Sequence, residues 1–125
     1  MYYLWYMQAM GDPKRLSARF FMLESGRMPV RDWLLDLSPQ DRKSVGDDIR
    51  VAEFGWPVGM PLCRPIMKRK GLWEIRSDLS NGRIARILFC IQDGAMVLLH
   101  GFVKKSRKTS NADLELASKR MRGLK

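Results

Sequence analysis

The chain has 125 residues, of which 46% are hydrophobic, and its formal net charge is +10. This length suits a single domain and is too short for two ordinary ones, while the hydrophobic content argues against global disorder. A basic excess of this size makes a polyanion the first kind of partner to consider.

The N-terminal segment, residues 1–15, is apolar at its start but does not read as a targeting or membrane segment. It lacks a basic leading region, a small-residue cleavage motif and the length that a membrane span requires. We therefore predict an N-terminal extension of residues 1–15 followed by one domain over residues 16–125, in a cytoplasmic protein without a membrane partner.

The first half of the domain predicts one strand and two helices. Residues 18–25 have the composition of a strand that ends at a glycine. Residues 29–37 then place apolar side chains at helical spacing, with a proline in the first turn. Ser38 and Pro39 begin a second helix, which Gly55 and the following proline end.

The second half predicts three strands and a helix. Residues 72–78, 83–92 and 95–104 read as strands, joined by loops that contain Asn-Gly and Asp-Gly pairs. Asn111 can cap a final helix that runs to about Arg122. The expected order is β-α-α-β-β-β-α, an α+β fold in which two helices cover one face of a small, mostly antiparallel sheet.

Alternation along the three later strands divides their side chains between two faces. We expect the apolar set under the helices, namely Trp73, Ile75, Ser77, Ala85, Ile87, Phe89, Ile91, Val97, Leu99, Gly101 and Val103. The opposite face would then carry Glu74, Arg76, Asp78, Ile84, Arg86, Leu88, Cys90, Leu98, His100, Phe102 and Lys104.

Turn length decides whether this division holds. Two-residue turns at both loops would place Arg76 opposite Ile87 and Arg86 opposite Gly101, which mixes the two sets. A three-residue loop with a bulge would restore them. We prefer the second arrangement, because an unpaired charge beneath the helices would cost several kcal/mol.

The positive charge is concentrated in the second half of the chain. Residues 1–63 contain 8 basic and 8 acidic side chains, whereas residues 64–125 contain 15 basic and 5 acidic ones. The meander should bring distant cations to one edge of the sheet, although a solvated basic surface is the simpler alternative. The residues that we expect to bind RNA there are Lys68, Lys70, Arg83, Phe102, Arg107 and Lys108.

Four ordered motifs resemble a known family. They are G-R-M-P-V-R-D-W-L (26–34), G-L-W-E-I-R (71–76), R-I-L-F (86–89) and L-L-H-G-F-V-K-K-S-R-K-T (98–109). Together they are similar to the HigB-type, phage-derived branch of the RelE/ParE toxin superfamily, and the likeness spans about residues 18–122.

This resemblance implies a small cytoplasmic toxin of a type II toxin–antitoxin system. Toxins on the RelE side of the superfamily are mRNA interferases, endoribonucleases that cut mRNA, usually on the ribosome. A cognate antitoxin, commonly a helix-turn-helix protein in this branch, neutralises them. The family's basic active face lies opposite the two helices, and its cations correspond here to Arg76, Arg86, Lys104 and Lys105, with Phe102 beside them.

The residues also fit cleavage without a metal or other cofactor. In such a reaction the substrate's 2′-OH attacks the adjacent phosphorus, and the site must move protons and stabilise negative charge. Arg76 and Arg86 suit the phosphate, and Lys104 or Lys105 suits the phosphate or the leaving oxygen. His100 is a candidate for proton transfer, but a histidine within an apolar strand is more often structural.

Other residues have plainer interpretations. Glu74 is at least as well explained as an ion-pair partner of Arg76 or Arg86 as it is by the role of a base. Cys63, Cys90 and the only histidine lack the spacing of a metal site, so we predict no metal and no disulfide.

Two other functions remain open at this stage. The first is a ParE-like toxin that poisons gyrase without nuclease activity, because relatives on that side share the fold. The second is a basic nucleic-acid-binding phage accessory protein.

Overall fold

A computed structural model of the chain describes residues 14–104 and 108–124. Its regular elements are named here in chain order: β1 (Ser17–Phe20), α2 (Pro29–Asp36), α3 (Pro39–Gly55), β2 (Cys63–Pro65), β3 (Trp73–Asp78), the 3-10 turn η1 (Ser80–Gly82), β4 (Ile84–Gln92), β5 (Ala95–Val103) and α4 (Asn111–Arg122). The predicted α+β class and element order are confirmed, with the short strand β2 as an addition. Residues 1–13 of the predicted N-terminal extension lie outside the described residues.

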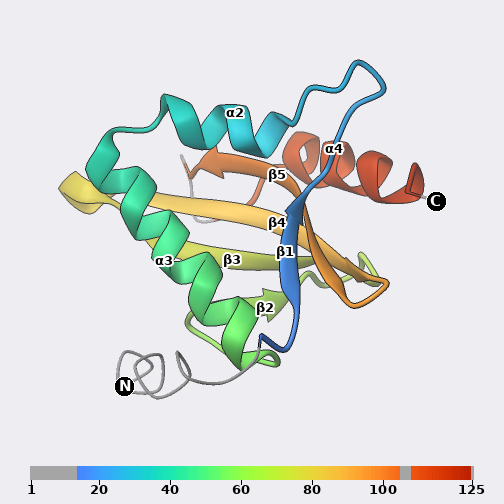
Figure 1. Ribbon diagram of the computed structural model, residues 1–125, viewed down its shortest axis with the longest axis horizontal. Helices are drawn as coiled ribbons and strands as arrows, with labels where there is room; N and C mark the ends of the chain where they lie inside the picture. Colours follow the sequence, from blue (N-terminus) through green and yellow to red (C-terminus); the bar gives the residue numbers. More distant parts are fainter. Residues whose placement is uncertain (1–13, 105–107, 125) are drawn as a thin grey trace.

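The strands form one five-stranded sheet in the order β1-β5-β4-β3-β2 (Figure 1). β1 runs parallel to β5, and the other neighbouring strands are antiparallel. β1 pairs with β5 only from Ala95 to Leu98, so no described strand continues along that edge of β5 from Leu99 to Val103.

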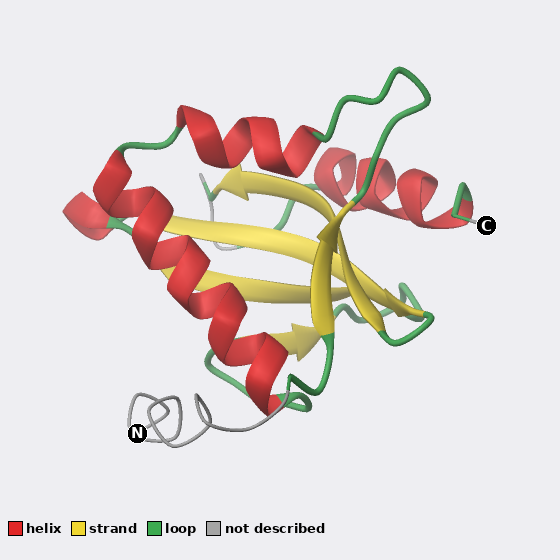
Figure 2. Ribbon diagram, in the orientation of Figure 1, coloured by secondary structure: helices red, strands yellow, loops and turns green. Residues whose placement is uncertain are grey.

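Helices α2 and α3 cover one face of this sheet, as predicted (Figure 2). α3 crosses in front of β3 and β4, whereas α2 lies against β5. Ser38 caps α3 by accepting a hydrogen bond from the backbone N–H of Asp41 at 3.2 Å, and Pro39 occupies the first turn. Within the described residues, no helix is long and apolar enough to cross a membrane.

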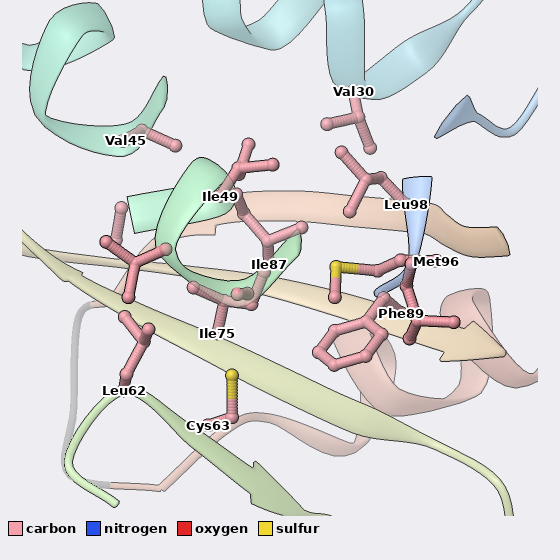
Figure 3. Close-up of a cluster of buried hydrophobic side chains, with 14 of the residues drawn as sticks. Val30, Val45, Ile49, Leu62, Cys63, Ile75, Ile87, Phe89, Met96 and Leu98 are labelled. Atoms are coloured by element: carbon pink, nitrogen blue, oxygen red, sulfur yellow. The ribbon is translucent and has the colours of Figure 1, made fainter. Parts of the chain in front are cut away.

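Apolar side chains from both layers meet in the main core (Figure 3). The helices contribute Val30, Val45 and Ile49, and the central strand β4 contributes Ile87 and Phe89, all of which are buried. This core fixes which face of β4 points inward and therefore which face presents Arg86.

The loops set the register in two different ways. The β3–β4 connection is the three-residue turn η1, which places Arg76 opposite Arg86. The β4–β5 connection is a two-residue turn in which Asp93 and Gly94 both have positive φ. A register shift at Leu88/Phe89 then places Arg86 opposite Phe102.

This bulge corrects part of the predicted division of β5. Gly101 and Val103 face the α2 and α3 side as expected, but Leu98 also lies in that core, where the opposite face was predicted. Val97 and Leu99 lie instead on the other face. The physical reason is that one additional residue in a strand reverses the alternation beyond it.

Helix α4 covers part of the face opposite α2 and α3. Its Ala117 packs with Leu72, Leu88, Cys90, Val97 and Leu99 in a second buried cluster. The helix is capped by Ser110, whose hydroxyl accepts from the Asp113 N–H at 3.1 Å, so the cap lies one residue before the predicted Asn111. The other end of this face carries Glu74, Arg76 and Arg86.

Candidate functional site

Glu74 and Arg86 lie side by side on neighbouring strands and are both buried. Their exposed fractions are 1% and 6%. Arg86 donates a short hydrogen bond from Nη1 to Oε2 of Glu74. Removing a carboxylate and a guanidinium from water costs free energy, which is offset only when the two groups pair. The contact with Glu74 therefore holds the Arg86 side chain in place.

Arg64 binds the same carboxylate from the edge strand β2. It lies opposite Glu74 in the β2–β3 pairing and donates from Nε to Oε2 at 2.9 Å. Sequence reasoning did not place Arg64 in the site. Its only signal was its position in a basic, irregular stretch, and the three-residue strand ending at Pro65 was too short to predict.

Arg76 and Lys104 extend this group of charges toward solvent. Arg76 lies opposite Arg86, has a side chain that is 44% exposed, and approaches Asp78 at 3.7 Å. Lys104 directly follows β5, and its backbone N–H donates to the carbonyl of Ile84 at 2.7 Å. Four cations and one carboxylate thus come from four parts of the chain, and we refer to Arg64, Glu74, Arg76, Arg86 and Lys104 as the basic cluster.

The environment of Lys104 lowers the affinity of its amino group for a proton. Burial and the positive charge of Arg86 lower its pKa below the ordinary lysine value of 10.5. Arg64 and Arg76 act in the same direction, whereas Glu74 opposes them. Lys104 is therefore a more available proton donor than an exposed lysine would be.

A small cavity borders the buried ion pair. Its volume is about 40 Å³, and its walls include Arg64, Glu74, Arg76 and Arg86. Glu74 Oε1 and Arg86 Nε make no hydrogen bond to any described residue. Both atoms are buried, so the described hydrogen bonds of the ion pair are concentrated on Oε2 of Glu74.

His100 is anchored to the beginning of α4. Its Nε2 lies 2.7 Å from Oδ1 of Asp113, whose Oδ2 accepts from the Ser110 hydroxyl at 2.7 Å. The imidazole also stacks on Phe102, with 5.3 Å between ring centroids and an interplanar angle of 26°. This geometry gives His100 a structural role, because it links β5 to α4, as does the hydrogen bond from Arg120 to the Leu99 carbonyl. Its candidate role in proton transfer stays a prediction.

A groove of about 460 Å³ begins beside Lys104. Trp33 of α2, Gly101 and Phe102 of β5, and Asp113 of α4 contribute to its walls, as do Ser110 and Lys108. Trp33 packs on Gly101 and against the main core. Only the tertiary structure shows that it also borders a groove.

The other predicted cations do not converge as expected. Arg83 donates from Nη2 to the buried Asp41 at 2.5 Å and to Ser80 Oγ at 2.9 Å, so its described contacts anchor η1 to α3. Lys68 and Lys70 are exposed and precede the start of β3, whereas Arg76 lies near its far end. The physical reason is that the 66–71 turn lies against α4, where Arg69 pairs with Glu115 at 2.9 Å.

Two predicted site residues, Lys105 and Arg107, lie outside the described residues. Lys108 is described and lines the groove. Of the predicted set, the structure therefore brings together Arg76, Arg86 and Lys104 directly, with Phe102 and Lys108 on the adjoining groove.

Neither cysteine lies in the basic cluster or the groove. Cys63 and Cys90 are both buried and not joined in a disulfide. Burial raises the pKa of the Cys63 thiol to about 12, which disfavours the reactive thiolate. Among the described residues there is no group of three or more metal-ligating side chains.

Comparison with known families gives one match. The model of a family described as "Phage derived protein Gp49-like (DUF891)" matches residues 32–122. This range contains the whole basic cluster and all the groove residues named above. No curated protein matches the chain.

Proposed function

Because the chain belongs to the Gp49-like family of phage-derived proteins, we propose that it is the toxin of a type II toxin–antitoxin system and acts as an mRNA endonuclease. The observation that carries this proposal is the basic cluster, where three arginines and a lysine surround one buried carboxylate. A site of this composition suits a phosphodiester, because guanidinium groups bind phosphate oxygens in pairs.

The proposed reaction is an intramolecular attack on phosphorus. The 2′-OH loses its proton and bonds to the adjacent phosphorus, and the P–O5′ bond breaks. The products are a 2′,3′-cyclic phosphate and a 5′-OH end, so no additional reactant is required. The site must stabilise the charge that develops on the phosphate and return a proton to the leaving oxygen.

Within this reaction the arginines have the electrostatic role. The Arg76 side chain is 44% exposed and would contact the phosphate oxygens. Arg86 is fixed by Glu74 and supplies an oriented positive charge behind the phosphate. Such preorganised charge stabilises a transition state without needing to rearrange during the reaction.

Lys104 is our candidate for the proton transfer to the leaving oxygen. Its pKa is lowered by burial and by Arg86, which brings it closer to the range in which an ammonium group donates readily. Glu74 is a weaker candidate, because two arginines already bind its Oε2. His100 is engaged by Asp113.

The proposed partners follow from the same function. We propose that mRNA on the ribosome is the substrate and that a helix-turn-helix antitoxin neutralises the toxin in the cytoplasm. A site without a well-placed general base would depend on the ribosome to orient the 2′-OH. This dependence can be tested by comparing cleavage of free and translated mRNA.

The decisive experiment is induced expression followed by mapping of new 5′ ends on cellular mRNA. We expect growth arrest together with cuts at preferred positions in translated regions, and neither effect from the Lys104→Met variant. Lys119→Met is a suitable control, because Lys119 is an exposed cation on α4 outside the basic cluster. Full-length mRNA accompanied by DNA breaks would contradict the proposal and support a gyrase-directed toxin.

A further inference from the structure

The groove beside Lys104 has the dimensions of a small-molecule site. Its volume of about 460 Å³ falls within the range of about 300–1,000 Å³ that is usual for ligand pockets. It runs beside the part of β5 that β1 leaves unpaired. A planar group entering here would meet side chains from three different elements.

Aromatic rings supply the apolar surface of the groove. Phe102 comes from β5 and is braced by its stacking on His100, while Trp33 comes from α2. Aromatic faces are the usual platforms for unstacked bases of single-stranded RNA, because every base has a π-face. Gly101 has no side chain, and the ring of Trp33 packs directly on its backbone at the wall of the groove.

The polar surface favours one kind of base. Among the described contacts, Oδ2 of Asp113 accepts from the Ser110 hydroxyl, and Oδ1 lies 2.7 Å from Nε2 of His100. A carboxylate has about four acceptor positions, so these two contacts alone do not fill it. Guanine alone among the RNA bases offers two adjacent donors, N1–H and N2–H, on its Watson–Crick edge.

Lys104 connects the groove to the basic cluster. It lines the groove and at the same time lies within the electrostatic reach of Arg86, Arg64 and Arg76. A base in the groove would therefore have its own backbone phosphate beside these cations. A nucleotide would satisfy both regions, whereas an inorganic anion would satisfy only the cluster.

The geometry points to a guanine-binding subsite in this groove, next to the phosphate that the basic cluster would bind. This inference rests on the proposed function, because it gives that site a preference for the substrate base. Stacking on Phe102 would contribute affinity, and the two acceptors of Asp113 would distinguish guanine from adenine.

Binding of mononucleotides to the purified full chain tests this subsite without any cleavage. The probes are GMP, AMP, CMP, UMP and ribose 5-phosphate, which lacks a base, with affinities measured by NMR titration. A bidentate contact discriminates between bases by about 1–3 kcal/mol, so GMP should bind about 5- to 150-fold more tightly than AMP. GMP should also shift the Phe102 and Asp113 resonances.

Two variants assign the effect to the groove. Phe102→Leu keeps an apolar side chain and should weaken binding of all nucleotides, but not of ribose 5-phosphate. Asp113→Asn should remove the difference between GMP and AMP, because one acceptor becomes a donor. Asp78→Asn, at an exposed carboxylate outside the groove, is the matched control and should leave the preference intact. Thermal unfolding of each variant verifies that it is folded.

Equal affinity for all five probes would overturn the subsite, because it would show phosphate capture alone. Absence of nucleotide binding would also overturn it and would favour another occupant, such as a peptide strand along β5. Neither result would bear on mRNA cleavage, which the mapping of 5′ ends decides independently. Conversely, if the protein preferred GMP but cut no mRNA, the guanine subsite would stand and the proposed nuclease activity would be wrong.

Discussion

Glu74 and Arg86 form a buried ion pair between β3 and β4, directly behind the exposed cations of the basic cluster. Arg86 therefore has a structural role in this ion pair and is also a candidate for stabilising charge on the phosphate. Loss of growth arrest in a variant of Arg86 is informative only if the variant still folds, so its stability must be measured along with its activity.

The buried pair predicts that replacing Arg86 destabilises the protein much more than replacing Arg76, although both arginines lie on the same face of the sheet. Arg86→Ala should lower the free energy of unfolding by about 3–5 kcal/mol, because it leaves the Glu74 charge buried without its partner on β4. Arg76→Ala removes an exposed pair with Asp78 and should cost less than about 1 kcal/mol. Urea unfolding of both variants measures the difference, and equal costs would contradict the burial of the pair.

Removing the charge of Lys104 should affect stability and activity in opposite directions. Its lowered pKa means that its charge is less favourable in the folded protein than in the unfolded chain, fully so at neutral pH, with the penalty vanishing as the pH rises past 10.5. Lys104→Met should therefore leave the protein at least as stable at pH 7, while cleavage falls about 10²- to 10⁴-fold. Unfolding at pH 7 and pH 10 verifies the sign: any gain in stability should shrink at the higher pH.

The packing of Trp33 on Gly101 predicts that position 101 requires glycine for steric reasons. A Cβ atom built on Gly101 would lie 2.5 Å from Cε3 of Trp33, so Gly101→Ala should destabilise the protein by about 1–3 kcal/mol. Gly46 lies within α3 and has no atom within 4 Å of a Cβ, so Gly46→Ala should instead stabilise it by about 0.5–1 kcal/mol. Thermal unfolding of the two variants measures both changes in stability. If Trp33→Leu failed to relieve the cost of Gly101→Ala, the clash would be excluded as its cause.

Asp41 predicts loss of stability in acid. Hydrogen bonds from the Ser80 N–H and from Arg83 lower the pKa of its carboxyl below 3.8, despite the opposing effect of burial. A depressed carboxyl pKa stabilises the fold above the ordinary value, and this contribution is lost as the pH falls through the folded-state pKa. Asp41→Asn should thus lower the melting temperature at pH 7, with a smaller difference below about pH 4. The exposed Asp36→Asn is the control, and a gap that does not depend on pH would contradict this assignment.

The sequence by itself determined the order of the main helices and strands, without the short strand β2, and the face of β4 that points inward. Alternation of Ala85, Ile87 and Phe89 with Arg86 and Leu88 reports burial directly, because a strand with one face under helices must keep its charges on the other. The motif that ends β5 also indicated Lys104 correctly as a neighbour of the arginines.

Only the tertiary structure decided the details of the site. The bulge in β5 depends on how two strands pair, so the pattern along one strand could not reveal that Leu98 points under the helices. The inclusion of Arg64 required the short strand β2, and the exclusion of Arg83 required its contact with Asp41 across 42 residues. Local sequence encodes which face a side chain takes, whereas the partner that satisfies its charge is set by elements that folding brings together.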